Sequence, residues 1–412
     1  MTTQRVFQLS GTCNNYPWGK QGRKSLAAQL CARTPGTDFT IDDEQYYSEM
    51  WFGDYPDFPA RVLQTGEPLA DVLERDQQTL LGKKVVDTMD AQLPFLPKIL
   101  SIAKALPLQL HPNKDLATRL HSQDPSQFTD PNHKPEIAVA LSEFELFAGF
   151  KPLQEIQALF SLPALRPYVP QAARQTDSQW DNETLRAVAR ALLKADDATV
   201  RATSDALLQH TPREALRAAG GGHIADLLPR LRAQHGPGDG GALVAVVCMN
   251  FLTLRPLDAV YIPADGVHAY LSGNIVECMA RSDNVLNVGF CPRADRDSAD
   301  LFAETLTFRP HSAGDVILPR RRSGRSSTGR TGVYSPPMSE FDMLVCGLGA
   351  GEGDEICAGE GPSVLFVTQG SGRMTADGTG FELREGFIYF VAPGVAVKWE
   401  TDSGMQVFMA TV

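Results

Sequence analysis

LPLQLHPNKD (residues 106–115) and, shortly after it, DPNHKPEIAVALSEFELFAGF (residues 130–150) are the sequences on which a prediction of the fold depends. In the first, Gln109 and His111 stand two positions apart. A β-strand turns residues with this spacing to the same face. One strand can therefore present an amide oxygen and an imidazole to a single point, and Glu136 in the second sequence adds a carboxylate.

A second imidazole is expected from His268, which lies far along the chain in YIPADGVHAYLSGNIVECMARSDN (residues 261–284). Two histidines, a glutamate and a glutamine suit a divalent metal with one position left for water or substrate. A structural interpretation competes with this one. A histidine in a strand next to Pro112 can be an ordinary hydrogen-bonded side chain, and the glutamine two positions before it can occur by chance. These residues alone leave both interpretations open.

Six segments in a fixed order add a resemblance to a known family. They are YPWGK (16–20), SEMWFG (48–53), LPFLPKILSI (93–102), LQLHPNK (108–114), NHKPE (132–136) and HAYLSGNIVECMARSDN (268–284). Together they resemble the type I mannose-6-phosphate isomerases over most of residues 1–310. The resemblance implies a mainly β fold with an α insertion, built from cupin-like β-sandwiches of the jelly-roll type and a helical domain.

The resemblance also implies a metal, a reaction and a pathway. The metal is zinc, one ion per chain, with Gln109, His111, Glu136 and His268 as ligands, although manganese, cobalt or iron would also suit such nitrogen and oxygen donors. The reaction is the interconversion of mannose 6-phosphate and fructose 6-phosphate, an aldose–ketose isomerisation through a cis-enediol. The pathway is GDP-mannose biosynthesis.

Isomerisation of this kind needs a base with a pKa near 7, an electrophile at the oxygens and exclusion of water. We expect Glu277 to be the base, because partial burial one strand from His268 would raise its pKa. We expect Lys134 to stabilise the enediolate. Lys98 stands among apolar residues, so it is expected either to line the same pocket or to extend its ammonium group to solvent. Further substrate contacts are expected from Trp18, Glu49, Arg281, Asp283, Asn287 and Arg293.

Two departures from the family pattern favour a diverged paralogue of the fungal type. The family usually has Gly-Thr-His-Pro where this chain has GDYP (residues 53–56), and it usually has arginine where Asn287 stands. Asparagine has neither the charge nor the fork of donors of arginine, so Arg281 or Arg293 would have to contact a phosphate. Two alternatives therefore stay open: an isomerase or epimerase of a different sugar, and a non-catalytic sugar-phosphate-binding protein.

Composition limits the partners. The 412 residues carry a formal net charge of −11, which argues against nucleic acid and leaves a small sugar phosphate as the expected partner. We expect no membrane span, no signal peptide, a cytoplasmic location and a monomer. The seven cysteines are scattered without a CxxC pair, which favours reduced thiols and disfavours a cysteine zinc site.

The pattern of apolar residues and turns predicts three domains. Residues 1–151 together with 242–315 form a cupin-like catalytic domain, residues 152–241 an all-helical insertion, and residues 316–412 a second cupin-like domain. Local expectations include one helix over residues 69–81, a helix or a strand over 242–252, a hairpin-like turn at Gly273–Asn274, a turn at 369–372 and a mobile loop over 318–330.

Overall fold

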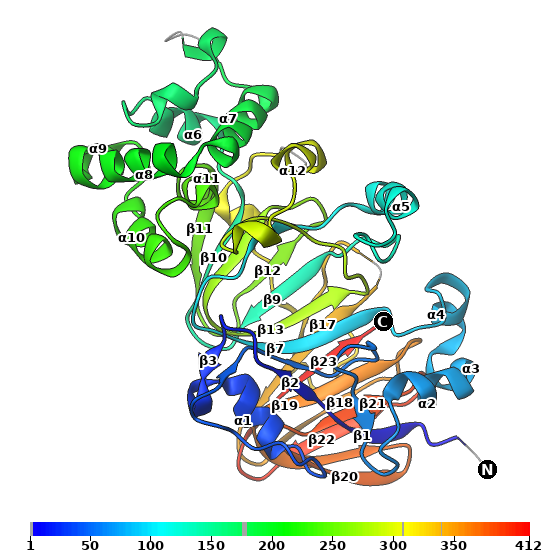
Figure 1. Cartoon of the computed structure of the whole chain (residues 1–412). Helices are drawn as coiled ribbons and strands as arrows, with labels where there is room; N and C mark the ends of the chain where they lie inside the picture. The colour runs from blue at the N-terminus through cyan, green and yellow to red at the C-terminus, as the bar shows by residue number, and fades with distance from the viewer. Residues whose placement is uncertain (1–2, 175–178, 307–308, 339) are drawn as a thin grey trace.

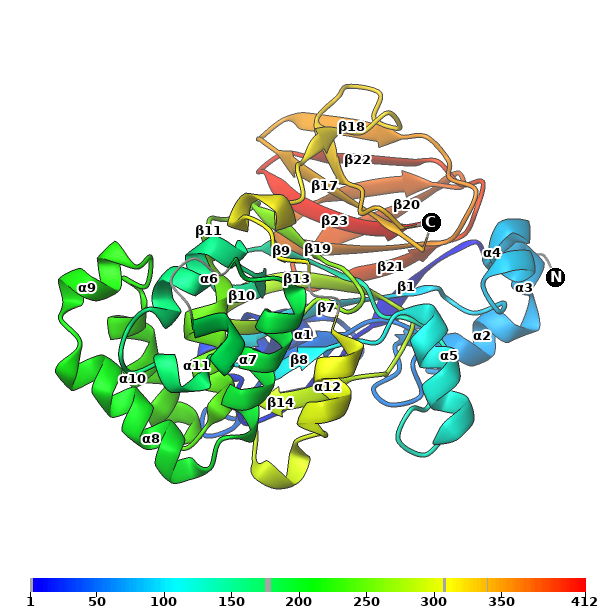
Figure 2. The same cartoon turned by 90° about the horizontal axis from the view of Figure 1, so that it is seen from above.

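The computed structural model describes residues 3–174, 179–306, 309–338 and 340–412. The described residues form two large sheets, in which the strands pair antiparallel, and a group of helices at one end (Figure 1). We call the ten-stranded sheet the central sheet and the eleven-stranded sheet the C-terminal sheet. The central sheet lies between the helices of residues 153–248 and the C-terminal sheet (Figure 2).

The central sheet follows the order β11-β10-β13-β7-β5-β2, with β8, β9, β12 and β14 paired alongside. Its strands are β2 (Thr12–Asn14), β5 (Glu49–Trp51), β7 (Phe95–Ile102), β8 (Leu108–Leu110), β9 (Glu136–Ala140), β10 (Phe144–Phe150), β11 (Met249–Leu254), β12 (Ala259–Ile262), β13 (His268–Ala280) and β14 (Leu286–Gly289). A short pair, β3 (Lys20–Gln21) with β4 (Tyr46–Tyr47), lies apart. All residues of β7 and β9 are buried, so both faces of these strands lie inside the protein, and the charged Lys98 and Glu136 are buried among their apolar residues.

The hairpin-like turn expected at Gly273–Asn274 is wrong, because β13 runs through these residues without reversing. The first half of the strand pairs with β10 and β8, and its second half pairs with β7 and β9. Gly273 has a φ of +128°, and a Cβ atom there would lie 2.6 Å from the Glu143 carbonyl oxygen. Glycine therefore lets the strand change partners here, where a larger residue would be strained.

The C-terminal sheet contains the first strand of the chain. Its members are β1 (Val6–Ser10), β6 (Arg61–Val62), β15 (Arg321–Arg322), β16 (Thr331–Tyr334), β17 (Asp342–Leu348), β18 (Glu352–Ile356), β19 (Ser363–Ala376), β20 (Thr379–Arg384), β21 (Ile388–Val391), β22 (Val397–Thr401) and β23 (Met405–Thr411). The turn expected at residues 369–372 is wrong, because β19 continues through them with an irregular register between Val367 and Gln369. Residues 318–330 include β15 and are held by Asp354, which accepts hydrogen bonds from Ser326, Thr328 and Thr331.

The helices are α1 (Leu26–Arg33), α2 (Leu69–Arg75), α3 (Gln77–Leu80), α4 (Gly82–Thr88), α5 (Lys114–Gln123), α6 (Leu153–Phe160), α7 (Asn182–Lys194), α8 (Asp197–Asp205), α9 (Arg213–Ala218), α10 (Ile224–His235), α11 (Gly240–Cys248) and α12 (Ala299–Thr305). Residues 69–81 are not one helix, because the chain leaves helical geometry at Asp76, whose carboxylate caps α3. Residues 242–252 are neither one helix nor one strand, because α11 ends at Cys248 and β11 begins at Met249.

Helix α11 connects the helical region to the central sheet. All of its residues are buried, as expected for a helix that is apolar on every side. A Cβ atom at Gly241 would lie 2.7 Å from the Gly289 Cα atom, so glycine permits α11 to approach β14 closely. The carboxylate of Asp239 caps this helix and also accepts the Phe290 amide at 2.7 Å.

The hydrophobic core crosses the sheet boundary. The rings of Phe52, which follows β5 of the central sheet, and Phe366 of β19 in the C-terminal sheet are 4.6 Å apart, and both belong to one apolar cluster with Phe7 and Phe390. The three-domain division therefore stays a prediction, since the first strand shares its sheet and core with the last part of the chain. Within the described residues, no helix has the length and apolar character to cross a bilayer.

Candidate metal centre and active site

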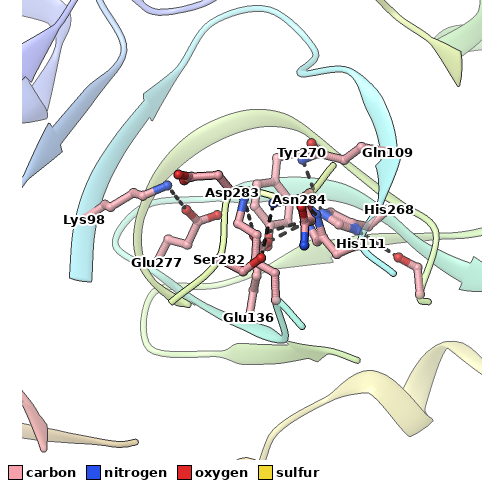
Figure 3. Close-up of polar contacts among 12 residues, drawn as sticks. Lys98, Gln109, His111, Glu136, His268, Tyr270, Glu277, Ser282, Asp283 and Asn284 are labelled. Carbon is pink, nitrogen blue, oxygen red and sulfur yellow. Dashed lines mark hydrogen bonds and ion pairs between the residues drawn. The ribbon is translucent and has the colours of Figure 1, made fainter. Parts of the chain in front are cut away.

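Three strands bring the expected metal ligands together. Gln109 lies in β8 with His111 just after it, Glu136 begins β9, and His268 begins β13 directly opposite Gln109. The ligand atoms of His111, Glu136 and His268 lie within 4.8 Å of one another, and all three residues are buried (Figure 3). These three side chains converge as a metal site requires, and Gln109 lies beside them with its amide nitrogen 3.3 Å from His268 Nε2.

The hydrogen bonds of the two imidazoles determine which nitrogen is free. His111 Nδ1 lies 2.8 Å from the Asn284 carbonyl oxygen, and His268 Nδ1 lies 3.0 Å from the Gly266 carbonyl oxygen. A carbonyl oxygen can only accept, so each Nδ1 carries a proton, and in the neutral form of each ring the lone pair is on Nε2. Burial, with Lys134 adding to it, lowers the pKa of His111 to about 4, which keeps the ring neutral.

The free lone pairs face the carboxylate of Glu136. His111 Nε2 is 3.3 Å from Oε1 of Glu136, and His268 Nε2 is 3.5 Å from Oε2. His111 Nε2 is also a buried atom without a hydrogen-bond partner among the described residues. The amide nitrogen of Gln109 lies 3.3 Å from His268 Nε2, and a flip of the amide would put its oxygen there. Two imidazole nitrogens and a carboxylate around one point fit a divalent metal ion.

Lys98 lies between two buried carboxylates on the neighbouring strands. It stands opposite Glu277 in the β7–β13 register and opposite Trp51 in the β5–β7 register. Its Nζ atom is 3.2 Å from Glu277 Oε2, 3.7 Å from Glu49 Oε2 and 4.5 Å from the centre of the Trp51 ring. The Trp51 indole N–H donates to Glu49 in turn. This contact between Trp51 and Lys98 was not predicted from the sequence.

The pKa of Glu277 is raised to about 7. Burial is the largest cause, the negative charge of Glu136 adds to it, and the positive charge of Lys98 opposes it. For Lys98, burial lowers the pKa, but the charges of Glu49 and Glu277 outweigh that effect and raise it. A cationic Lys98 therefore faces a glutamate that can gain or lose a proton near neutral pH.

Lys134 and Tyr270 also contact the carboxylate of Glu136. Lys134 Nζ lies 3.5 Å from Oε1 of Glu136, and the Tyr270 hydroxyl donates to Oε2 at 3.4 Å. The sequence interpretation gave Tyr270 no role. The signal was present, because Tyr270 follows His268 by two positions on one strand and so shares its face.

The segment after β13 carries Arg281 and Asp283. The pKa of Asp283 is raised, chiefly because its carboxyl group is partly buried. Lys134 opposes this shift, and the negative charge of Asp130 adds to it. Asp283 lines a cavity of about 490 Å³ together with Arg281, Tyr55 and Lys114. The guanidinium of Arg281 forms an ion pair with the buried Asp54 and lies 4.6 Å from the centre of the Tyr55 ring.

The remaining predicted substrate residues lie in three different places. Trp18 is half-buried against the apolar cluster that contains Tyr270, and it stacks on Tyr16. Asn287 pairs with Gln109 in the β8–β14 register, and its backbone N–H donates to Asp297 at 2.7 Å. Arg293 forms an ion pair with Asp197 of α8, and its side chain is 65% exposed. The structure therefore places Glu49, Lys98, Lys134 and Glu277 beside the expected metal-binding point. Arg281 and Arg293 instead form ion pairs with other carboxylates, those of Asp54 and Asp197.

Sequence comparison agrees with this geometry. The family described as "Phosphomannose isomerase type I, catalytic domain" matches residues 6–153. The mannose-6-phosphate isomerase of Schizosaccharomyces pombe is 36% identical over 94% of this chain and 94% of its own length. The chain belongs to the type I mannose-6-phosphate isomerases. The mannose-6-phosphate isomerase of Saccharomyces cerevisiae is 33% identical, with 97% of this chain and 96% of the yeast protein covered.

Solved mannose-6-phosphate isomerases share the fold. The metal-free enzyme of Salmonella typhimurium superposes with a TM-score of 0.80 at 23% identity and covers 99% of each chain. A mannose-6-phosphate isomerase bound with zinc and yttrium superposes with a TM-score of 0.78 at 24% identity, covering 98% of this chain and 99% of that one. The expected mainly β, cupin-like fold with helices is thus confirmed, and the jelly-roll topology stays a prediction.

Proposed function

We propose that this mannose-6-phosphate isomerase homologue interconverts mannose 6-phosphate and fructose 6-phosphate with a bound metal ion. The observation that supports this most is the position of the Lys98–Glu277 pair beside the convergent His111, Glu136 and His268. A metal-binding point, a base and a cation in one buried place are what proton transfer between adjacent sugar carbons needs. The nearly full-length similarity to proteins named mannose-6-phosphate isomerase supports the same substrate.

Gln109, His111, Glu136 and His268 would hold the metal, which we propose to be one zinc ion per chain. When bound, such an ion polarises carbonyl and hydroxyl oxygens of a sugar. We assign the proton abstraction and the remaining charge stabilisation to side chains of the protein. The Nε2 lone pairs of His111 and His268 would be taken up by the metal while each Nδ1 donates to a backbone carbonyl oxygen, so neither ring would be available as the base.

Glu277 is the base in this proposal. Its carboxylate removes the proton from C2 of the open-chain aldose, which leaves a cis-enediolate with its negative charge on the C1 oxygen. The proton of the C2 hydroxyl passes to the C1 oxygen, and the carboxylic acid of Glu277 returns the first proton to C1, which gives the ketose. The buried position of Glu277 limits exchange of that proton with water. Lys98 holds the carboxylate by an ion pair, and Lys134 supplies positive charge beside Glu136 for the enediolate.

The roles of Trp18, Glu49, Asp283, Asn287, Arg281 and Arg293 in substrate binding stay predictions. Either arginine would have to exchange a protein carboxylate for the phosphate, since Arg281 pairs with Asp54 and Arg293 with Asp197. The uncharged Asn287 and these two ion pairs favour, as a second candidate function, isomerisation of a sugar without phosphate. A cytoplasmic location, a monomeric state and a place in GDP-mannose biosynthesis also stay predictions.

A coupled assay of mannose 6-phosphate isomerisation tests the proposal. The zinc-loaded protein is compared with the chelated protein and with the double variant Gln109→Ala, His111→Ala. We expect turnover only with metal and with intact ligands, and recovery when zinc is returned to the chelated protein. His210→Ala is the matched control, because His210 is exposed on the helical region. Folded, metal-bound protein without turnover would contradict the proposal, and free mannose in the same assay would then test the second candidate.

A further inference from the structure

Asp130 accepts hydrogen bonds from its own loop and from segment 282–284. Its Oδ1 atom accepts from the Ser282 hydroxyl at 2.9 Å and from the Asn132 backbone N–H at 2.8 Å. Its Oδ2 atom accepts from the Asp283 backbone N–H at 2.8 Å. Its carbonyl oxygen accepts from the side-chain amide of Asn284 at 2.6 Å. One half-buried aspartate therefore holds the whole segment 282–284.

That segment leads directly to a metal ligand. The Asn284 carbonyl oxygen, at the end of the segment, accepts the Nδ1 proton of His111 at 2.8 Å (Figure 3). Asn284 is itself buried, and its side-chain amide also donates to the Asn132 carbonyl oxygen at 3.0 Å. The path from Asp130 to the ring of His111 thus contains only hydrogen-bonded and largely buried groups.

The same segment carries Asp283, whose carboxyl group lies on the wall of the neighbouring cavity. The Asp283 backbone N–H is one of the donors to Asp130. Asn132 adds a second tie, because its side-chain amide donates to the Arg281 carbonyl oxygen at 2.8 Å. Segment 130–132 therefore holds segment 282–284 in place. The first segment precedes the expected ligand Glu136, and the second orients the expected ligand His111.

The chemistry requires aspartate rather than asparagine at position 130. Each carboxylate oxygen accepts from a backbone N–H, Oδ1 from Asn132 and Oδ2 from Asp283. Asparagine would replace one of the two oxygens with an NH2 group, and in either orientation a donor would face a donor. A buried or half-buried donor left without an acceptor is costly.

We propose that Asp130 is a positioning residue for the metal centre. It keeps the Asn284 carbonyl oxygen hydrogen-bonded to the Nδ1 proton of His111, so that the Nε2 lone pair stays directed toward the metal. Groups that orient metal-bound histidines typically change metal affinity about 10- to 100-fold when they are removed. The inference rests on the proposed function only where turnover is concerned. Metal affinity and the state of the His111 ring can be measured without any substrate.

The test compares Asp130→Asn with the matched variant Asp124→Asn. Asp124 stands six positions earlier and accepts three hydrogen bonds from Ser126 and Gln127, all on Oδ1. Asparagine keeps an oxygen at that position, so no donor is placed opposite another donor. The variant therefore removes only the charge of an aspartate in the same part of the chain. Zinc affinity is measured by competition with a chromophoric chelator. The ¹⁵N shifts of the His111 ring are measured in the metal-free protein, and the melting temperature of each variant is recorded.

We expect Asp130→Asn to weaken zinc binding about 10- to 100-fold and to shift the His111 ring nitrogens away from the Nδ1–H tautomer. Asp124→Asn should leave both unchanged. A melting temperature lowered in Asp130→Asn with wild-type zinc affinity and ring shifts would overturn the proposal, because the role would then be structural. Absence of turnover by the wild-type chain would count against the proposed function and would leave this comparison intact.

A milder variant covers the case in which Asp130→Asn fails to fold. Ser282→Ala removes only the hydroxyl that donates to Asp130 and accepts the Asn284 N–H at 3.2 Å. It should weaken zinc binding by about two- to tenfold, as the loss of one or two hydrogen bonds to the segment suggests. Unchanged zinc affinity in Ser282→Ala together with unchanged His111 ring shifts would overturn the proposal.

Discussion

Glu277 is a buried carboxyl group whose pKa of about 7 sets the pH at which it can act as a base. The base must be deprotonated, so kcat/KM should rise about tenfold per pH unit below pH 7 and level off above it. Glu277→Gln should lower kcat about 10²- to 10⁴-fold and remove this pH dependence, with metal affinity retained. A pH series in the coupled assay measures both.

Glu143→Gln serves as the control for this prediction, since Glu143 is exposed in the turn before β10. It should keep the wild-type kcat and pH profile. A Glu277→Gln protein that retains more than a tenth of the wild-type kcat would exclude Glu277 as the base, and the search for the base would move to Glu49, the other carboxylate on Lys98.

The two arginines expected to bind phosphate differ in what their removal would expose. Asp54 is 4% exposed, so Arg281→Ala would leave a buried carboxylate without its partner and should lower the free energy of unfolding by about 3–5 kcal/mol. Arg293→Ala breaks an exposed ion pair and should cost at most about 1 kcal/mol. Urea unfolding of the metal-free variants measures the difference. Equal losses of stability would contradict this interpretation of the Asp54–Arg281 pair.

The resemblance to a known family named the four expected metal ligands, whose residue types alone left a structural role open. The structure brings three of them, His111, Glu136 and His268, within 4.8 Å of one another. Asp130 and Trp51 were missed because their contacts join segments far apart in the chain: Asp130 meets Ser282, and Trp51 meets Lys98. No local pattern specifies a pairing of that kind.

At the scale of elements, β13 carries both His268 and Glu277, so the course of this one strand determines the distance between the metal-binding point and the proposed base. Gly273→Ala should lower the free energy of unfolding by at least about 1–3 kcal/mol, because alanine is strained at a φ of +128° and its Cβ would meet the backbone of Glu143. Zinc affinity should fall with it. Denaturant unfolding and zinc titration check the two effects.

Gly347→Ala in β17 is the matched control, because an added Cβ there has no atom within 4 Å among the described residues. Its stability should stay within about 0.5 kcal/mol of wild type. If Gly273→Ala proved as stable as Gly347→Ala, the change of partners along β13 would not depend on glycine.

Elements were predicted well where apolar spacing was regular and poorly where glycine appeared. The helical character expected of residues 152–241 is present in α6 to α10. The glycines at 273 and 370 were interpreted as turns, since glycine is frequent there, but each lies inside a long strand with positive φ. Residues 242–252 were ambiguous because a buried helix and a buried strand are both apolar throughout.

At the scale of the whole molecule, β1 ties the start of the chain to the C-terminal sheet. It pairs with β21 over four residues, from Val6 opposite Val391 to Leu9 opposite Ile388. Deletion of residues 1–10 should therefore lower the melting temperature and raise amide exchange in β21. Hydrogen exchange with mass spectrometry measures this by segment. Unchanged protection of β21 would mean that β1 is dispensable for the sheet.

The pairing of β1 with β21 also has a consequence for synthesis. Val6 leaves the ribosome early, but its partner Val391 follows roughly 380 residues later. At a rate of about 5–20 residues per second, the strand remains without its neighbour for roughly 20 to 80 s. During that interval its apolar residues Phe7 and Leu9 are available to other nascent chains, so the yield of folded protein in a cell should depend on the chaperones that bind the first strand.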